Sequence, residues 1–335
     1  MNKFWSIPLA LLCCGCSVST ETEKRQGSRD NIINVRDKVT EIVIEDPFIS
    51  SLNRICLMDE YLIIQDYKAL DKLILLFDRN TFEYITGVAD RGQGPNEIAN
   101  MGHIAVDEAH RRFYVTDHGK NRIFSYNLDS VWGGSSSYLP EVKTSMDETL
   151  FPDDYQIVND SIVIGRIIQP IGTNNFKPAV GKMNLLTGEI TLMPYKHPKI
   201  TGRKRSSVVV SLEHGLYVEY YHNHDLMTIC NLDGHFICNI CGPDWSEDVK
   251  PAYNYYCKAV FCADRIYTSY LGENGINEKM QSNLPAKLHV FDLDGNYIHT
   301  LETGLHISDF CYDRDNNRLI MCFNDDVQFG YLPLD

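Results

Sequence analysis

Short apolar runs recur along the chain, and their length and β-branched and aromatic content predict β-strands rather than helices. Six of these runs lie at similar intervals and start at Tyr61, Arg112, Ser161, Gly215, Arg265 and Arg318. The gaps between successive starts are 51, 49, 54, 50 and 53 residues. Another apolar run precedes each of the six, a third follows it, and most units carry a fourth. The sequence therefore predicts six repeats of about fifty residues.

The turns between the third and fourth runs predict antiparallel pairing within each repeat. Tight-turn sequences ending in Gly188, Gly234 and Gly295 separate these runs in three of the repeats, and glycine there favours a hairpin. Four antiparallel strands per repeat are typical of a β-propeller blade. We therefore predict an all-β fold, a six-bladed β-propeller of four-stranded antiparallel blades over residues 37–335.

The last repeat has no fourth run, whereas residues 37–46 (DKVTEIVIED) form a spare strand ahead of the first repeat. We expect this N-terminal strand to complete the last blade and close the ring. Closure of this kind pairs an edge that would otherwise be free to aggregate.

The N-terminal residues indicate export. An apolar run over residues 4–14 follows Lys3, and it is too short to span a bilayer but long enough for a signal-peptide core. The stretch Leu12–Cys16 resembles a bacterial lipobox, which implies a lipid on Cys16. We predict a lipoprotein signal peptide over residues 1–15; a plain secretory signal cut nearby is the alternative. Residues 17–30 hold one apolar side chain, so residues 16–36 are predicted to form a flexible, lipid-anchored tether.

Together, the repeats, the lipobox and the loop over residues 91–97 (RGQGPNE) resemble the six-bladed, TolB-like propeller lipoproteins of Bacteroidetes. That family carries a similar glycine-rich loop before a blade, which here matches residues 103–124. Similar blades occur in NHL-like proteins. The resemblance implies the propeller fold and, from NHL-like proteins, the binding of partners.

Composition narrows the class of ligand. The 335 residues include 31 Lys and Arg against 45 Asp and Glu, a net charge of −14. So acidic a protein repels phosphate backbones, and we expect no nucleic-acid partner. Of the 11 cysteines, eight follow the leader, mostly in strand-like runs, and are predicted to be buried. Cys238 and Cys241 lie on opposite faces of one such strand, which argues against a redox or zinc site.

Connections of unequal length indicate a binding face. Those joining strands two to three, and one blade to the next, share one face of a propeller and are long here, while the opposite face has short hairpins. The long stretches are residues 87–101, 142–154, 166–177, 195–206, 241–254 and 270–285. Since tight turns would suffice for connection alone, we place the binding face there.

Within this face, the first candidate ligand-binding residues are Arg91, Gly92, Gly94 and Glu97. Their backbone amides could form an anion-binding nest. The alternative is structural: the glycines shape a blade crossover and Arg91 pairs with a nearby carboxylate.

The other candidates are scattered over the same face. His222 and His224 could chelate a metal with a third ligand such as His118, but a solvated polar loop is the alternative, and we predict no metal and no cofactor. Arg203 belongs to a short basic cluster that could meet a carboxylate or phosphate, with a solvated turn as the alternative. Trp245 could stack on a sugar ring or pack against a neighbouring blade.

No nucleophile elbow, phosphate-binding loop or zinc-protease motif is present in the sequence. We therefore predict a non-enzymatic, lipid-anchored binding module of the cell envelope, on the outer membrane, that presents its loop-rich face to a protein or glycan. The lipid would be its only contact with the membrane. The alternative is an envelope polysaccharide lyase or a lactonase-like hydrolase with a site at the channel mouth.

Overall fold

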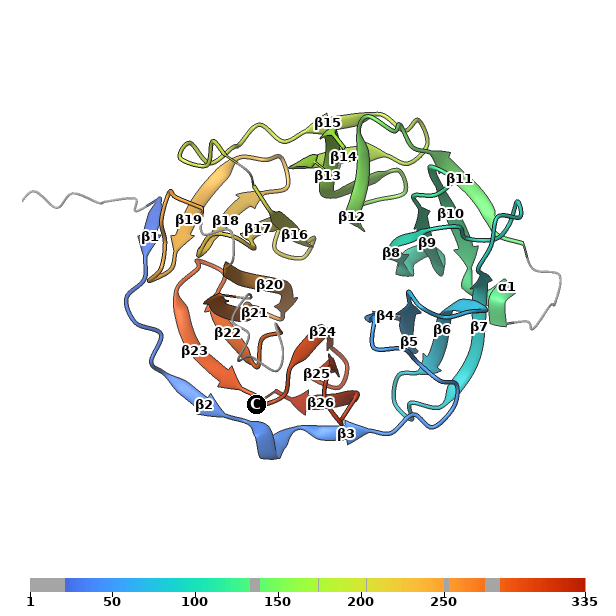
Figure 1. Cartoon of the computed structure of the whole chain (residues 1–335), viewed down its shortest axis with the longest axis horizontal. Helices are drawn as coiled ribbons and strands as arrows, with labels where there is room; N and C mark the ends of the chain where they lie inside the picture. Colours follow the sequence, from blue (N-terminus) through green and yellow to red (C-terminus); the bar gives the residue numbers. More distant parts are fainter. Residues whose placement is uncertain are drawn as a thin grey trace, which may run out of the picture.

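The computed structural model describes residues 22–132, 139–173, 175–202, 204–249, 253–274 and 284–334. In these ranges the chain forms six antiparallel sheets arranged around a central axis (Figure 1). Each sheet contains four strands in meander order, and two sheets carry one additional outer strand. The predicted all-β, six-bladed propeller is confirmed. The predicted signal peptide and Cys16 lie outside the described residues.

Each blade runs from an inner to an outer strand. Blade 1 contains β4 (Asn53–Met58), β5 (Tyr61–Asp66), β6 (Lys72–Asp78) and β7 (Tyr84–Asp90). Blade 2 contains β8 (Met101–Asp107), β9 (Arg112–Asp117), β10 (Arg122–Asn127) and β11 (Glu141–Ser145). Blade 3 contains β12 (Phe151–Ile157), β13 (Ile162–Gly172), β14 (Asn175–Asn184) and β15 (Ile190–Leu192).

The second half of the ring follows the same plan. Blade 4 contains β16 (Ser206–Ser211), β17 (Leu216–Tyr221), β18 (Leu226–Asn231) and β19 (Phe236–Cys241). Blade 5 contains β20 (Tyr253–Cys262), β21 (Arg265–Asn274), β22 (Lys287–Asp292) and β23 (Tyr297–Glu302). Blade 6 contains β24 (Ile307–Asp313), β25 (Arg318–Phe323), β26 (Phe329–Pro333) and the N-terminal β3 (Thr40–Ile42).

The N-terminal strand β3 closes the ring as predicted. It pairs antiparallel with β26, with Ile42 opposite Phe329 and Thr40 opposite Tyr331. First and last parts of the chain therefore share blade 6, and the ring has no free edge at this point.

Residues 22–36, which the sequence assigned to the flexible tether, are ordered as a strap along the outside of two further blades. Strand β1 (Glu23–Arg25) pairs parallel with β19, and β2 (Ile32–Asn34) pairs parallel with β23. Figure 1 shows this segment in blue, passing along blades 4, 5 and 6 in turn. We call residues 22–36 the strap. Their polar composition concealed the pairing because the hydrogen bonds use backbone groups, which every residue supplies.

The core lies between the blades rather than within one layer. Six of the apolar clusters each combine buried side chains from two neighbouring blades. The cluster between blades 1 and 2, for example, packs Phe113 and Phe124 against Ile74 and Leu76. Second strands such as β5 are buried on both faces, which explains their continuous apolar runs.

Helical structure is slight. It comprises α1 (Leu128–Trp132) and the 3-10 turns η1 (Arg36–Lys38) and η2 (Glu108–His110). No helix in the described part of the chain has the length and apolar character needed to cross a bilayer.

The predicted connection in blade 3 is instead part of a long hairpin. Residues 166–177 were expected to be a loop, but β13 and β14 pair through this region almost to their shared tip. The hairpin therefore projects from the loop-rich face, with Ile171 and Phe176 exposed near its end. Pro170 and Gly172 interrupt the apolar pattern here, so the sequence did not indicate that the strand pairing continues beyond the body of the sheet.

Candidate functional site

A cavity of about 740 Å³ occupies the channel along the propeller axis and is lined by the inner strands of all six blades. At the loop-rich face, where each inner strand begins, the side chains that line the cavity form a ring. One residue comes from each blade in turn: Arg54, His103, Asp154, Ser207, Lys258 and Asp309. We call this set the mouth ring. It places five titratable side chains and one hydroxyl around a single opening.

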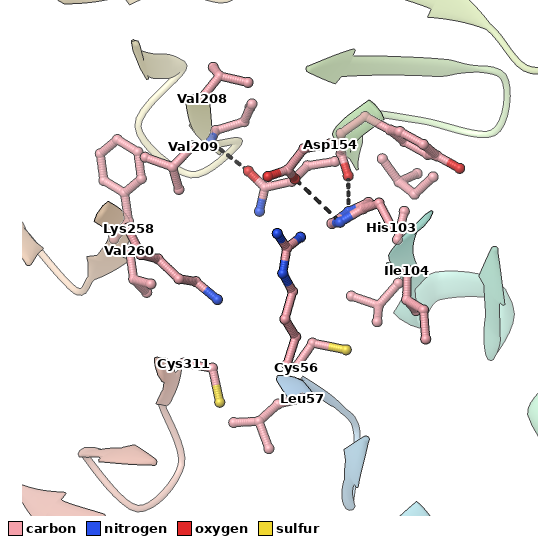
Figure 2. A pocket seen from close by; sticks show the side chains of 18 of the residues that line it. Cys56, Leu57, His103, Ile104, Asp154, Val208, Val209, Lys258, Val260 and Cys311 are labelled. Carbon is pink, nitrogen blue, oxygen red and sulfur yellow. Dashed lines mark hydrogen bonds and ion pairs between the residues drawn. The ribbon is translucent and has the colours of Figure 1, made fainter. Parts of the chain in front are cut away.

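The next layer of the channel is mostly apolar. Side chains two residues apart on a strand share a face, so the residues two positions after the mouth ring form a second ring. These are Cys56, Ala105, Gln156, Val209, Val260 and Cys311, and all of them line the cavity. Figure 2 shows Val209, Val260, Cys56 and Cys311 together with His103, Asp154 and Lys258. The cavity is thus polar at the loop-rich face and mostly apolar in its second layer, and it ends at polar residues of the hairpin face, among them Asp107, His110 and Asp160.

Blades 5 and 6 meet at a direct ion pair in the mouth ring. Lys258 donates to Asp309, whose second oxygen accepts the backbone N–H of Ile55 at 2.8 Å. Burial alone would lower the pKa of Lys258, but the neighbouring Asp309 carboxylate outweighs burial and raises it. Lys258 is therefore held in its charged form by its contact with Asp309.

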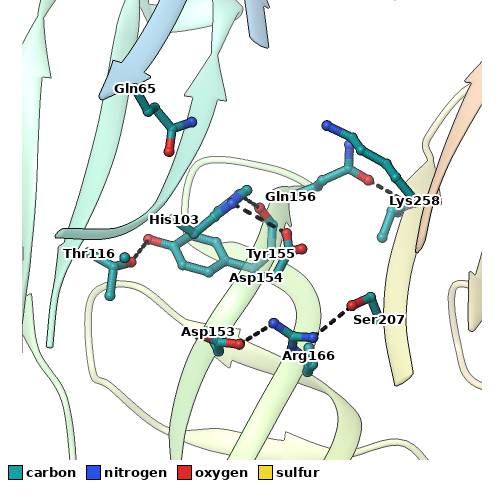
Figure 3. Close-up of polar contacts among 12 residues, drawn as sticks. Gln65, His103, Thr116, Asp153, Asp154, Tyr155, Gln156, Arg166, Ser207 and Lys258 are labelled. Atoms are coloured by element: carbon teal, nitrogen blue, oxygen red, sulfur yellow. Dashed lines mark hydrogen bonds and ion pairs between the residues drawn. The ribbon is translucent and has the colours of Figure 1, made fainter. Parts of the chain in front are cut away.

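A second ion pair links blades 2, 3 and 4. The Arg166 guanidinium donates to the Asp153 carboxylate and, at 2.6 Å, to Ser207 Oγ (Figure 3). His118 Nε2 lies 3.5 Å from the other Asp153 oxygen. Burial would raise the pKa of Asp153, but His118 and Arg166 hold it well below its usual value.

The same chain of contacts reaches blade 5 through His222. Its Nε2 lies 3.0 Å from Ser207 Oγ, and its Nδ1 donates to the Tyr256 carbonyl at 2.6 Å. Burial lowers the pKa of His222 to about 4, so the ring is neutral at pH 7. A neutral ring with Nδ1–H accepts from Ser207 at Nε2, which engages both nitrogens.

His103 is likewise engaged on both sides. Its Nε2 donates to the Tyr155 carbonyl at 2.7 Å, and Nδ1 lies 3.3 Å from Asp154 Oδ1 (Figure 3). Burial lowers the pKa of His103, with Asp154 opposing that shift.

Arg54 differs from the other cations of the ring. It is exposed within the channel, and its guanidinium lies over the Tyr67 ring, 5.8 Å from the centroid. Among the described residues it makes no hydrogen bond or ion pair, although Asp154 and Asp309 act on it electrostatically.

The predicted glycine-rich loop is closed on itself. Arg91 donates to the carbonyls of Tyr67 and Ala69 at 2.6 and 2.7 Å. Glu97 accepts the Gly94 N–H at 2.6 Å, and a Cβ at Gly92 would meet the Glu97 carboxylate at 1.9 Å. The loop thus has the geometry of a blade crossover, and its polar groups are engaged within the protein.

The remaining predicted residues separate into two places. His118 and His222 join the mouth network described above. His224 faces away from it: its Nδ1 lies 3.1 Å from the Ser246 carbonyl, and its ring lies 5.6 Å from that of Trp245. His222 and His224 therefore do not converge, and within the described ranges no three His, Cys, Asp or Glu side chains form a metal-binding group. Arg203 lies outside the described residues.

Sequence reasoning missed most of the mouth ring. Arg54, His103, Asp154, Lys258 and Asp309 each stand alone in sequence, near the start of an apolar run. The signal that could have found them is their shared position, one per repeat. Only superposition of the six repeats reveals it, because neighbouring members are tens of residues apart.

Comparison with known proteins supports the fold. A family model described as "DUF5128: 6-bladed beta-propeller" matches residues 44–145, which span blades 1 and 2. No curated protein matches this chain.

Solved structures extend the likeness to the whole ring. A member of the DUF4221 family from Bacteroides vulgatus is 13% identical with a TM-score of 0.58, covering 90% of this chain and 99% of that one. A predicted exported protein of Bacteroides fragilis is 10% identical with a TM-score of 0.54, covering 90% and 88%. The Cps50 (Swd1) propeller domain of Myceliophteria thermophila is 7% identical with a TM-score of 0.50, covering 89% and 99%. At these identities the likeness shows a shared fold and not a shared activity.

Proposed function

We propose that this protein is a non-enzymatic binding module of the cell envelope, held by a lipid on Cys16, which receives its ligand at the mouth ring. The observation that carries the proposal is the graded cavity: charged groups from several blades surround one opening, and an apolar layer lies beneath them. Concave sites of a few hundred Å³ with a few convergent polar groups are typical of ligand binding.

The state of the histidines favours binding over proton transfer. His222 has both ring nitrogens hydrogen-bonded to protein groups, and His103 Nε2 donates to the Tyr155 carbonyl. A general base needs a lone pair within reach of substrate. The tyrosines of the channel are not available as bases at neutral pH. Burial raises the pKa of Tyr67 and of Tyr220 to about 12, which keeps both phenols protonated.

The course of the strap supports a membrane anchor on the side away from the mouth. Strand β1 is parallel to β19, which as a fourth strand runs from the hairpin face towards the loop-rich face. Thr22, the first described residue, therefore lies at the hairpin side of blade 4. Only five residues separate Cys16 from Thr22, a span of at most about 20 Å. A lipid on Cys16 would leave the mouth ring directed away from the bilayer.

Exposed apolar side chains favour a protein as the larger partner. On the loop-rich face they are Phe48, Leu52, Leu70, Ile171 and Phe176. Exposed apolar groups beside a polar opening are common at protein interaction sites. A glycan partner would instead depend on the mouth ring alone.

The test is capture of partners from native envelopes with C-terminally tagged protein in mild detergent. We expect a co-purifying envelope component that is lost from Arg54→Gln and from the double variant Ile171→Ser/Phe176→Ser. Matched controls on the hairpin face, Arg314→Gln and Leu186→Ser, should retain it. Equal recovery by all four variants, or recovery of the protein alone together with no binding to glycan and peptide panels, would contradict the proposal.

The second candidate is an envelope polysaccharide lyase or lactonase-like hydrolase at the same opening. The convergence of Arg54, His103 and Asp154 favours it, since acid, imidazole and cation are the groups such chemistry employs. Turnover of acidic polysaccharides or lactones that is abolished by His103→Gln and Asp154→Asn, but not by Arg314→Gln, would establish this candidate.

A further inference from the structure

The mouth ring and the adjoining ion pair contain equal numbers of opposite charges. The cations are Arg54, Arg166 and Lys258, and the acids are Asp153, Asp154 and Asp309. Arg166 is paired with Asp153, and Lys258 is paired with Asp309. The two charges that remain are Arg54 and Asp154, and no ion pair joins them to each other.

Arg54 presents an unengaged guanidinium to the channel. Its only close partner in the described chain is the face of the Tyr67 ring, so its N–H groups are directed neither at a carboxylate nor at a carbonyl. A guanidinium whose N–H groups have no acceptor is the group that best binds a carboxylate through two parallel hydrogen bonds.

Asp154 presents the opposite charge. Its one close polar contact is with His103 Nδ1, at 3.3 Å. Since His103 donates from Nε2 to the Tyr155 carbonyl, its neutral form has no proton on Nδ1 to offer Asp154. Burial disfavours the doubly protonated form of His103. The Asp154 carboxylate therefore lacks a hydrogen-bond donor in the described chain. Burial would raise its pKa, but the nearby His103, Arg166 and Arg54 lower it.

We propose, building on the proposed function, that the mouth ring binds a zwitterion of the amino-acid or short-peptide class. Its carboxylate would be held by Arg54 and its ammonium group by Asp154. An apolar side chain of the ligand would then lie against Ala105, Val209 and Val260 of the second ring.

Ligands of other charge fit less well. A purely anionic ligand at Arg54 would be repelled by Asp154 and Asp309, and a purely cationic one at Asp154 would be repelled by Arg54. A neutral sugar would leave both charges without an ionic partner. Only a net-neutral ligand with separated charges matches both sites, and about 740 Å³ accommodates a dipeptide.

The test is calorimetric titration of the purified protein at pH 7 with leucylleucine and two capped forms, N-acetyl-leucylleucine and leucylleucine amide. We expect the free dipeptide to bind at least about tenfold more tightly than either capped form. Arg54→Gln should weaken binding of the free dipeptide by about tenfold or more but have little effect on the amide. Asp154→Asn should also weaken binding of the free dipeptide by about tenfold or more, with little effect on binding of the N-acetyl form.

Two controls on the opposite rim accompany these variants. Arg112→Gln and Asp233→Asn make the same chemical changes at hairpin-face residues that do not line the cavity, and they should leave the affinity unchanged. Thermal unfolding of every variant separates loss of binding from loss of fold.

The opposite results overturn the inference in distinguishable ways. If the N-acetyl form or a uronic acid binds as tightly as leucylleucine and depends on Arg54 alone, the ligand is an anion and the envelope-binding function stands. If no dipeptide binds while Arg54→Gln still loses its envelope partner, the ligand class is wrong and the function stands. If no dipeptide binds and Arg54→Gln keeps every partner, both proposals fail.

Discussion

The Arg29 guanidinium lies 3.3 Å from the Asp225 carboxylate, with 6% and 0% of the two side chains exposed. Arg29 comes from the strap, and Asp225 comes from the connection between β17 and β18 of blade 4. The same guanidinium donates to the Tyr256 hydroxyl at 2.7 Å and lies 5.0 Å from the centre of the Tyr270 ring, both in blade 5. One side chain thus fastens the strap at the seam between two blades.

Removing this contact should destabilise the propeller. In Arg29→Met, Asp225 remains buried without its ionic partner, although the Tyr270 hydroxyl and the Asp244 N–H still donate to it, so we expect the free energy of unfolding to fall by about 3 kcal/mol. Chemical denaturation measures this. The control is Arg25→Met in the same strap, whose side chain is 63% exposed and pairs only with Glu23; it should change stability by less than about 0.5 kcal/mol. Equal effects of the two substitutions would mean that the strap is not fastened at Arg29.

The contribution of strand β3 to stability can be tested by substitutions at two adjacent positions. Ile42 is 5% exposed and packs in the cluster between blades 6 and 1, whereas Val43 is 68% exposed. Ile42→Ala should lower the free energy of unfolding by about 2–4 kcal/mol through lost burial and a cavity. Val43→Ala should be nearly neutral. A stable Ile42→Ala variant would show that ring closure does not depend on this contact.

Stability should fall in mild acid because His222 is held neutral. Burial lowers its pKa to about 4, against about 6.5 in the unfolded chain. Between these values the unfolded state binds more protons, so stability rises with pH from 4 to 6.5 and His222 accounts for up to about 3 kcal/mol of that rise. His222→Gln should flatten the slope in this window, as measured by denaturation at several pH values. His235→Gln, on an exposed turn, should not, and an unchanged slope in His222→Gln would count against the buried neutral ring.

The thiols of the channel should react slowly although the channel is open. Burial raises the pKa of Cys56 to about 12, so little thiolate is present at pH 7.5. We expect iodoacetamide to modify Cys56 about a hundredfold more slowly in the folded protein than in denaturant, after allowing for the higher nucleophilicity of the more basic thiolate. Mass spectrometry of the Cys56 peptide follows the reaction. Comparable rates in both states would contradict the buried, protonated thiol.

The amino-acid sequence by itself determined the architecture. Apolar runs near Tyr61, Arg112 and their counterparts recur at nearly equal intervals, and glycine turns join the strands locally. Strand formation and hairpin pairing depend on neighbours within a few residues, so a linear pattern is sufficient to predict them. The missing last strand and the spare strand over residues 37–46 even predicted how the ring closes.

The tertiary structure alone decided the strap and the mouth ring. Residues 22–36 look like a tether because they are polar, yet they are ordered by the backbone of β19 and β23 and by Asp225, some 200 residues away in sequence. Arg54 and Asp154 are a hundred positions apart, and they face one cavity only because six blades bring their inner strands to a common axis. Contacts set by ring geometry leave no local periodicity in the sequence, so the pattern that predicted the fold could not locate its centre.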